Sequence, residues 1–166
     1  MARLLITRGL PASGKTTFAR GLQPGVVRVN RDDLRRMLHG RRLFTQVAEG
    51  HVTHAQRAAV EALLRAGADV VVDDTNLPAT TVREWAGLAA RLHASFEVHD
   101  FTDVPAEECV RRDAERPAEE RVGADAIRRM HDRYLAGRSL PLPVPFVRPG
   151  GPGQVDRPTH HSEGDF

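Results

Sequence analysis

The feature that most constrains this chain is a glycine-rich run near its start, Gly9-Leu10-Pro11-Ala12-Ser13-Gly14-Lys15-Thr16. It matches the pattern G-x-x-x-x-G-K-[ST], in which backbone N–H groups surround a phosphate at the beginning of a helix. An apolar, β-prone run precedes it at 3–7 and a helical pattern follows over 14–21, as that mechanism requires. A glycine-rich turn that matches by chance is the alternative. The predicted nucleotide-binding residues are Gly9, Pro11, Ala12, Ser13, Gly14, Lys15, Thr16 and Thr17.

Within this loop we expect Lys15 to reach the β- and γ-phosphates of a nucleoside triphosphate and Thr16 to hold Mg²⁺. Lys15 is the only lysine among 24 basic residues, the others being arginines. The only two asparagines, Asn30 and Asn76, also lie in segments singled out below. A formal net charge of +2 permits a polyanionic partner without requiring one.

Strands and helices alternate along the chain, which predicts a parallel sheet with helices on both sides. We expect strands at 3–7, 26–29, 70–72 and 96–101. Helices are expected at 14–21, at a short segment capped by Asp32 or Asp33, at 45–66 with a weak point near Gly50, and at 80–92, 105–116 and 125–134. The predicted fold is an adenylate-kinase-like α/β P-loop NTPase fold with a four-stranded parallel sheet and a small helical lid over about 105–122.

The domain is expected to cover 1–148, with Leu142, Val144 and Phe146 packing back on it, and a proline- and glycine-rich tail at 149–166 is expected to be disordered. No apolar run reaches the ~18 residues of a membrane helix, and no signal peptide is apparent. A single cysteine, Cys109, excludes an internal disulfide and is expected to be a buried hydrophobe. We therefore expect a cytoplasmic protein, in a bacterial cell or a phage-infected host.

Acidic residues follow the second and third predicted strands, where ligands bind in parallel sheets. Asp32 or Asp33 can accept a proton from an attacking hydroxyl, and Arg35 lies on the same helical face as Asp32 and can pair with a phosphate. A helix cap with a surface ion pair explains these residues equally well. After the third strand, either acid of Asp73-Asp74 can serve as a Walker B-like residue that helps to hold Mg²⁺. An ordinary strand-end turn is the alternative there.

Two arginines four residues apart, Arg112 and Arg116, share one face of the helix after the fourth strand. Small kinases place arginines here on a lid that neutralises charge during phosphoryl transfer. A solvated, salt-bridged helix is the alternative, because acids are interleaved with the arginines.

Taken together, GLPASGKTTFA, VNRDDLR, VVVDDTNL and the CVRRDAER segment resemble the 5′-kinase domain of bacteriophage-type polynucleotide kinases, from about Leu4 to about Tyr134. The resemblance implies transfer of the γ-phosphate of ATP, with Mg²⁺, to 5′-hydroxyl ends of DNA or RNA. It implies Asp32 as general base, Arg35 at the acceptor's phosphate backbone, and Val122 and Ala126 near its terminal base. The implied catalytic residues are Lys15, Asp32, Arg35 and Arg116; Arg112 and Arg116 also contact the nucleotide. The implied acceptor-binding residues are Asp32, Arg35, Asp74, Thr75, Asn76 and Val122, and the implied metal ligands are Thr16 and Asp74.

The phage enzymes continue into a phosphatase domain with a D-x-D-G-T motif that this chain lacks, so no 3′-phosphatase activity is expected. The oligomeric state stays open, and a repair ligase is a functional neighbour by analogy. Two other functions fit the motifs: a P-loop kinase of a small metabolite or sugar, with a closed acceptor pocket, and an ATPase module with no acceptor. Preferences for DNA or RNA and for single or double strands are not determined by these motifs.

Overall fold

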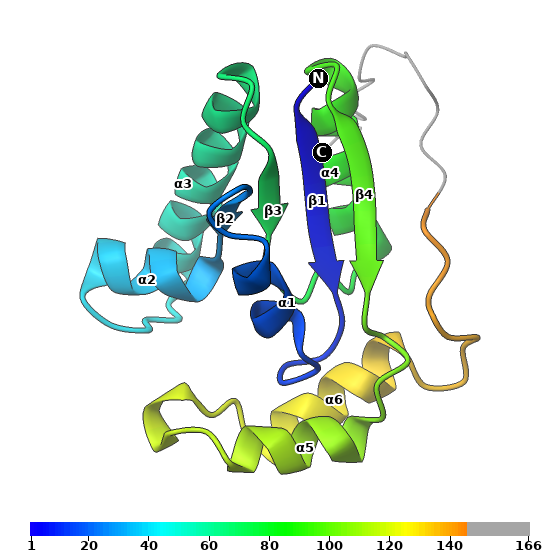
Figure 1. Ribbon diagram of the computed structural model, residues 1–166. Helices are drawn as coiled ribbons and strands as arrows, with labels where there is room; N and C mark the ends of the chain where they lie inside the picture. The colour runs from blue at the N-terminus through cyan, green and yellow to red at the C-terminus, as the bar shows by residue number, and fades with distance from the viewer. Residues whose placement is uncertain (146–166) are drawn as a thin grey trace, which may run out of the picture.

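The fold is built on a four-stranded parallel sheet, seen in a computed structural model that describes residues 1–145 (Figure 1). The strands are β1 (Arg3–Arg8), β2 (Val27–Val29), β3 (Val70–Val72) and β4 (Ser95–Asp100), in the spatial order β2-β3-β1-β4. Leu4 to Ile6 of β1 lie opposite Val70 to Val72 of β3 on one side and Phe96 to Val98 of β4 on the other. The predicted α/β P-loop fold is confirmed.

Helices cover both faces of the sheet, because the central strands are apolar on both. The helices are α1 (Lys15–Gly21), α2 (Arg31–His39), α3 (Gln46–Arg65), α4 (Ala79–Arg91), α5 (Ala106–Ala114) and α6 (Ala124–Tyr134), with a short 3-10 helix, η1 (Ala118–Glu120). On one face, Leu4 and Ile6 pack with side chains of α3 and α4, including Trp85. On the other face, Leu5 and Val71 pack with α1 through Ala19. The phosphate loop, α2, α5 and α6 are thereby gathered near the carboxyl ends of the strands (Figure 1).

Most observed boundaries lie within one or two residues of the predicted ones, with two differences. The second helix begins at Arg31 and its N-cap is Asn30, whose side-chain oxygen accepts the Asp33 N–H at 3.0 Å. The prediction of Asp32 or Asp33 as the cap is therefore wrong, and both acids lie in the first turn. The third helix runs through Gly50 without a break, since Ala48 and Val52 on either side are buried against the domain.

A second, smaller core joins α5 and α6 to the phosphate loop. It contains the fully buried Leu10, Cys109 and Ile127, and also Leu142, which is 6% exposed. The predictions for Cys109 and Leu142 are confirmed, whereas Val144 is 55% exposed; Phe146 and the predicted tail lie outside the described residues. None of the helices in residues 1–145 is both long enough and apolar enough to cross a membrane.

Candidate active site

The phosphate loop connects β1 to α1 through a backbone conformation that glycine permits. Gly9 has φ 154°, and a Cβ atom there would lie 2.9 Å from both the Phe101 Cβ and the Ser13 Oγ. Gly14 caps α1 with φ 108°, and Ala12 between them also has a positive φ of 62°. These backbone angles place the loop directly before the start of α1, where the helix dipole favours an anion.

Lys15 is the one basic side chain of the loop, and it is 7% exposed. Its ammonium donates to the Leu10 carbonyl oxygen at 2.5 Å and to the Ser13 hydroxyl at 3.3 Å. Burial lowers the pKa of Lys15 to about 8, against the opposing attraction of Asp73. Both hydrogen-bond acceptors of the ammonium are uncharged oxygens, so the ammonium favours an incoming anion such as a phosphate.

A buried carboxylate lies beside the first turn of α1. The Thr16 hydroxyl donates to the Asp73 Oδ1 at 3.2 Å, and Arg28 donates to the other carboxylate oxygen at 2.7 Å. Asp73 directly follows β3 and is 1% exposed. A hydroxyl oxygen and a carboxylate oxygen are the hard ligands that Mg²⁺ prefers. The acid beside Thr16 is therefore Asp73, whereas Asp74, which was predicted to share a metal site with Thr16, contacts Arg31 and Gln56 instead.

Asp32 presents one free carboxylate oxygen at the start of α2. Its Oδ1 accepts from the Arg35 Nη1 at 2.7 Å and from the Arg42 Nε at 3.3 Å. Within residues 1–145 its Oδ2 has no hydrogen-bond partner, and the side chain is 39% exposed. Two guanidinium groups hold one oxygen and leave the other able to accept a proton or a hydroxyl hydrogen bond.

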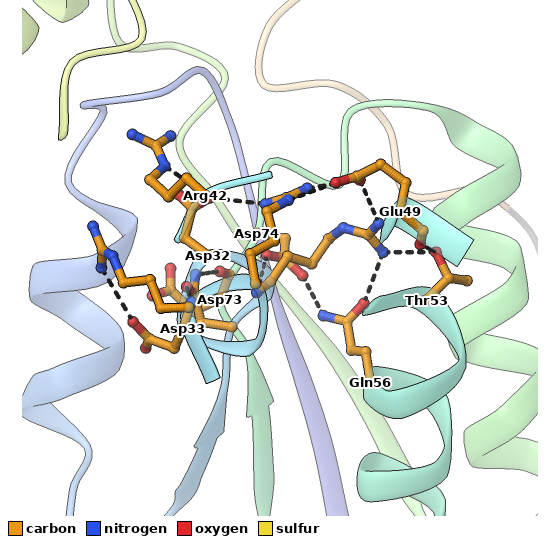
Figure 2. A network of polar contacts seen from close by, with 12 residues as sticks. Asp32, Asp33, Arg42, Glu49, Thr53, Gln56, Asp73 and Asp74 are labelled. Carbon is orange, nitrogen blue, oxygen red and sulfur yellow. Dashed lines mark hydrogen bonds and ion pairs between the residues drawn. The ribbon is translucent and has the colours of Figure 1, made fainter. Parts of the chain in front are cut away.

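Arg35 is also held by Glu49 of α3, which is labelled in Figure 2. Its Nε and Nη2 donate to the two Glu49 oxygens at 2.6 and 2.8 Å, a bidentate pair. Glu49 also accepts from Arg31 at 2.8 Å, and the hydrogen bonds from Arg35 and then Arg31 lower its pKa to about 2. Arg35 has five N–H donors and uses three in these contacts, so two remain for another group.

Asp74 belongs to the same network of polar contacts, which reaches it through Arg31 and Gln56 (Figure 2). Its Oδ1 accepts from the Arg31 backbone N–H at 3.1 Å and its Oδ2 from the Gln56 side-chain amide. Desolvation raises the pKa of Asp74 to about 7, although both hydrogen bonds oppose that shift. The carboxylate thus ties the end of β3 to α2 and α3, and so helps to set the position of Asp32.

The two predicted lid arginines lie over the phosphate loop, in and just after α5. Arg112 donates to Glu108 at 2.7 Å, and Arg116 lies 3.5 Å from Asp113. The buried Asp113 carboxylate in turn accepts the N–H groups of Val122 and Gly123 at 2.8–3.1 Å, which folds the lid segment back toward α2. Arg112 therefore keeps a surface ion pair, as the alternative expected, while facing the loop.

Two hollows meet at the phosphate loop. The loop hollow, about 800 Å³, is lined by Ala12, Gly14, Lys15, Thr16, Thr17, Phe18, Gly21, Leu22, Arg112 and Arg116. The aspartate hollow, about 400 Å³, is lined by residues that include Pro11, Asn30, Asp32, Arg35, Arg42, Phe44, Asp73, Asp74, Thr75, Arg121, Val122 and Met130. Ala12, Lys15, Thr16 and Arg116 line both. A molecule in one hollow would therefore meet a molecule in the other at Lys15 and Arg116.

Comparison with known proteins identifies the family. Residues 4–141 match the AAA domain family AAA_33. The chain belongs to this family of P-loop kinases. It is 29% identical over 187 residues to a protein of Autographa californica nuclear polyhedrosis virus whose name describes a bifunctional polynucleotide kinase/RNA ligase, covering 99% of this chain and 26% of the viral protein.

Solved structures share the fold of the kinase domain. A chain of the Pnkp1/Rnl/Hen1 RNA repair complex matches with a TM-score of 0.71 and 33% identity, over 80% of this chain and 44% of that chain. The APS kinase CysC of Mycobacterium tuberculosis shares the fold at 23% identity and a TM-score of 0.54, with 68% of each chain covered. The kinase domain thus spans less than half the length of the viral protein and of the repair-complex chain.

Some residues that were predicted to belong to the site have a structural role or lie outside the two hollows. Asn76, predicted to bind an acceptor, is 5% exposed and its amide donates to the Thr7 carbonyl oxygen at 2.7 Å, which fixes the turn after β3. Gly9 and Ser13 line neither hollow; the first gives room to Phe101 and the second accepts from Lys15. Ala126 lines a third hollow, beside α6, that also includes Thr75. Burial and neighbouring backbone, rather than motif membership, decide which side chains face the site.

Several residues of the site were not predicted, and of these only Arg31 lies in a quoted motif: Arg28, Arg31, Arg42, Phe44, Glu49, Gln56, Arg121 and Met130. One signal was available for α3, whose buried face follows Ala48, Val52, Gln56, Val60 and Leu64 at four-residue steps. A glutamine in the middle of that stripe needs a buried partner, and the partner is Asp74.

Proposed function

We propose that this kinase domain transfers the γ-phosphate of ATP to the 5′-hydroxyl end of a polynucleotide, DNA or RNA. The observation that carries the proposal is the junction of the two hollows at Lys15, Thr16 and Arg116, with the free oxygen of Asp32 on the acceptor side. The relatives named for polynucleotide kinase activity and for an RNA repair complex support the same substrate class.

In the proposed reaction the donor lies in the loop hollow. The loop N–H groups and Lys15 bind its β- and γ-phosphates, and Arg112 and Arg116 contact them from the lid. Thr16 and Asp73 would hold Mg²⁺, which when bound neutralises phosphate charge. The donor and the metal thus depend on residues from β1, α1, β3 and the lid.

The acceptor lies in the aspartate hollow. Asp32 accepts the proton of the 5′-hydroxyl through its free Oδ2, the 5′-oxygen forms a bond to the γ-phosphorus, and the bond from that phosphorus to the β–γ bridging oxygen breaks, releasing ADP. Arg35, held by Glu49, uses its remaining donors on a phosphate of the acceptor strand, and Thr75 and Val122 line the channel.

The deciding experiment is incubation with γ-labelled ATP and 5′-hydroxyl oligonucleotides of DNA and RNA, single- and double-stranded, followed by gel separation. Label on the oligonucleotide, absent when the 5′ end already carries phosphate, is the expected result. Label on small sugars or nucleosides alone would identify a metabolite kinase instead, and ATP hydrolysis that oligonucleotides do not change would identify an ATPase module.

The product of this reaction, a 5′-phosphate end, is what a ligase joins. A functional link to a repair ligase is proposed on that basis and on the ligase activity in the viral relative's name. Adding an RNA or DNA ligase to the labelled product should convert it to a joined strand that resists phosphatase.

A further inference from the structure

Phe44 is an aromatic side chain left largely in solvent at the edge of the aspartate hollow. It lies between α2 and α3 and is 61% exposed, more than any other aromatic side chain in residues 1–145. It belongs to none of the apolar clusters formed by those residues. Burying a phenylalanine stabilises a protein by about 1.5–3 kcal/mol, so the fold gains little of this from Phe44.

The side chains around Phe44 are cationic, which suits binding of a nucleotide better than binding of an apolar partner. The Arg35 guanidinium lies 4.8 Å from the ring centroid and that of Arg42 lies 5.5 Å from it. Both arginines also contact Asp32, so the ring and the general base are linked through a single guanidinium. An exposed ring beside cationic groups combines a face for a flat base with charge for the backbone that carries it.

Further contacts hold the two cationic neighbours of the ring in place. Arg35 is fixed by its bidentate pair with Glu49, and Arg42 reaches across the hollow to the Glu119 carbonyl oxygen of the lid at 3.1 Å. Both cationic neighbours of Phe44 are therefore anchored at both ends, on the helices and on Asp32 or the lid. Arginines held in this way lose little side-chain freedom when an acceptor strand binds beside them.

Resting on the function proposed above, we propose that Phe44 is the stacking platform for a nucleobase at the 5′ end of the acceptor strand. The short link from Phe44 through Arg35 to Asp32 limits the partner to the first or second nucleotide, since Asp32 meets the 5′-hydroxyl itself. The contact is sequence-tolerant, because every base has a π-face. It selects a polynucleotide end over a sugar or another small alcohol.

The test measures each variant of Phe44 on acceptors that lack single bases. Phe44→Ala, Phe44→Leu and Phe44→Tyr are compared with the full chain on 5′-hydroxyl oligonucleotides that are intact or abasic at the first, second or third nucleotide. Val47→Ala is the control, since Val47 is a neighbouring apolar side chain, 69% exposed, outside both hollows. Melting temperatures establish that each variant is folded, and the KM for ATP is measured in parallel.

We expect Phe44→Ala and Phe44→Leu to raise the acceptor KM by about 5- to 100-fold, and Phe44→Tyr and Val47→Ala to change it less than about twofold. The KM for ATP should not change. On the acceptor that is abasic at the first or the second nucleotide, Phe44→Ala and the wild type should differ by less than about twofold, because the base that stacks is already missing.

Three results would overturn the platform. One is an equal effect of Phe44→Ala on intact and abasic acceptors, which indicates a sugar or apolar contact. Another is an effect of Phe44→Ala that disappears only on the acceptor that is abasic at the third nucleotide. The last is full activity of Phe44→Leu. Each of these leaves 5′ labelling intact, whereas failure of the proposed function appears as the absence of label with the wild-type protein.

Discussion

Replacing Glu49 by glutamine tests whether α3 positions Arg35 for the acceptor. Glu49 accepts both donors of Arg35, at 2.6 and 2.8 Å, and one donor of Arg31. Glutamine keeps the length of the side chain and one acceptor oxygen, but it removes the charge and the bidentate geometry. The change therefore weakens the contact without opening a cavity.

The expected loss of stability follows from the pKa of Glu49, which its arginines lower from 4.5 to about 2. At about 1.36 kcal/mol per unit, that difference corresponds to roughly 3 kcal/mol at neutral pH. The side chain is 32% exposed, so solvent screening reduces the figure to about 2 kcal/mol. For a chain of this length the melting temperature should fall by about 4–8 °C.

The sign of the pH dependence is fixed by the lowered pKa. The contribution of Glu49 is complete above about pH 4.5 and is lost as the pH falls toward 2. The difference in melting temperature between wild type and Glu49→Gln should therefore be constant from pH 5 to 8 and should shrink below pH 4. Other groups titrate in both proteins and cancel in this difference.

In the kinase assay, Glu49→Gln should lower kcat/KM for the oligonucleotide by about tenfold, since a charge-assisted hydrogen bond exceeds a neutral one by about 1.5 kcal/mol. The KM for ATP should stay unchanged. Glu61→Gln is the matched control, because Glu61 pairs with Arg65 on the same helix but at the exposed surface, and it should change stability by less than about 1 kcal/mol. A uniform loss across pH, or an equal loss of ATP binding, would refute the positioning role.

Four further predictions concern single side chains of the site. Asp32→Ala should lower kcat by about 10²-fold or more in single-turnover labelling, and near-normal turnover would remove it as general base. Arg35→Ala should raise the KM of the oligonucleotide more than that of ATP; the reverse would assign Arg35 to the donor. Lys15→Met should abolish ATP binding yet raise the melting temperature at pH 7, because burial lowers the pKa of Lys15 to about 8; the gain should vanish above about pH 10.5, and its persistence there would contradict the charge explanation. Burial raises the pKa of Asp74 to about 7, so the contribution of this carboxyl to stability is complete below about pH 4 and falls as the pH rises to 7. In thermal melts, the melting temperature of Asp74→Asn should therefore rise relative to that of the wild type over this interval. Parallel curves would argue against a buried, titrating carboxyl.

The sequence predicted the fold well because its strongest signals are local. The phosphate loop needs positive φ at Gly14, and its lysine and threonine have fixed places in the turn. The run of three valines at 70–72 is apolar on every side, which is typical of a strand buried between two layers. The predicted cap of α2 was wrong because several neighbouring side chains can cap a helix, and in the structure Asn30 does so rather than Asp32.

The chain by itself therefore determined the sheet, the phosphate loop and the helices that carry Asp32, Arg35, Arg112 and Arg116. The sequence did not distinguish the roles of the adjacent residues Asp73 and Asp74. Their side chains point to opposite sides at the end of the strand, and only the packed structure shows that Asp73 contacts Thr16 and that Asp74 contacts Gln56. Tertiary structure also brought Glu49 to Arg35, across 14 residues of chain. Pairs of this kind depend on how two helices pack, and no local pattern encodes that distance.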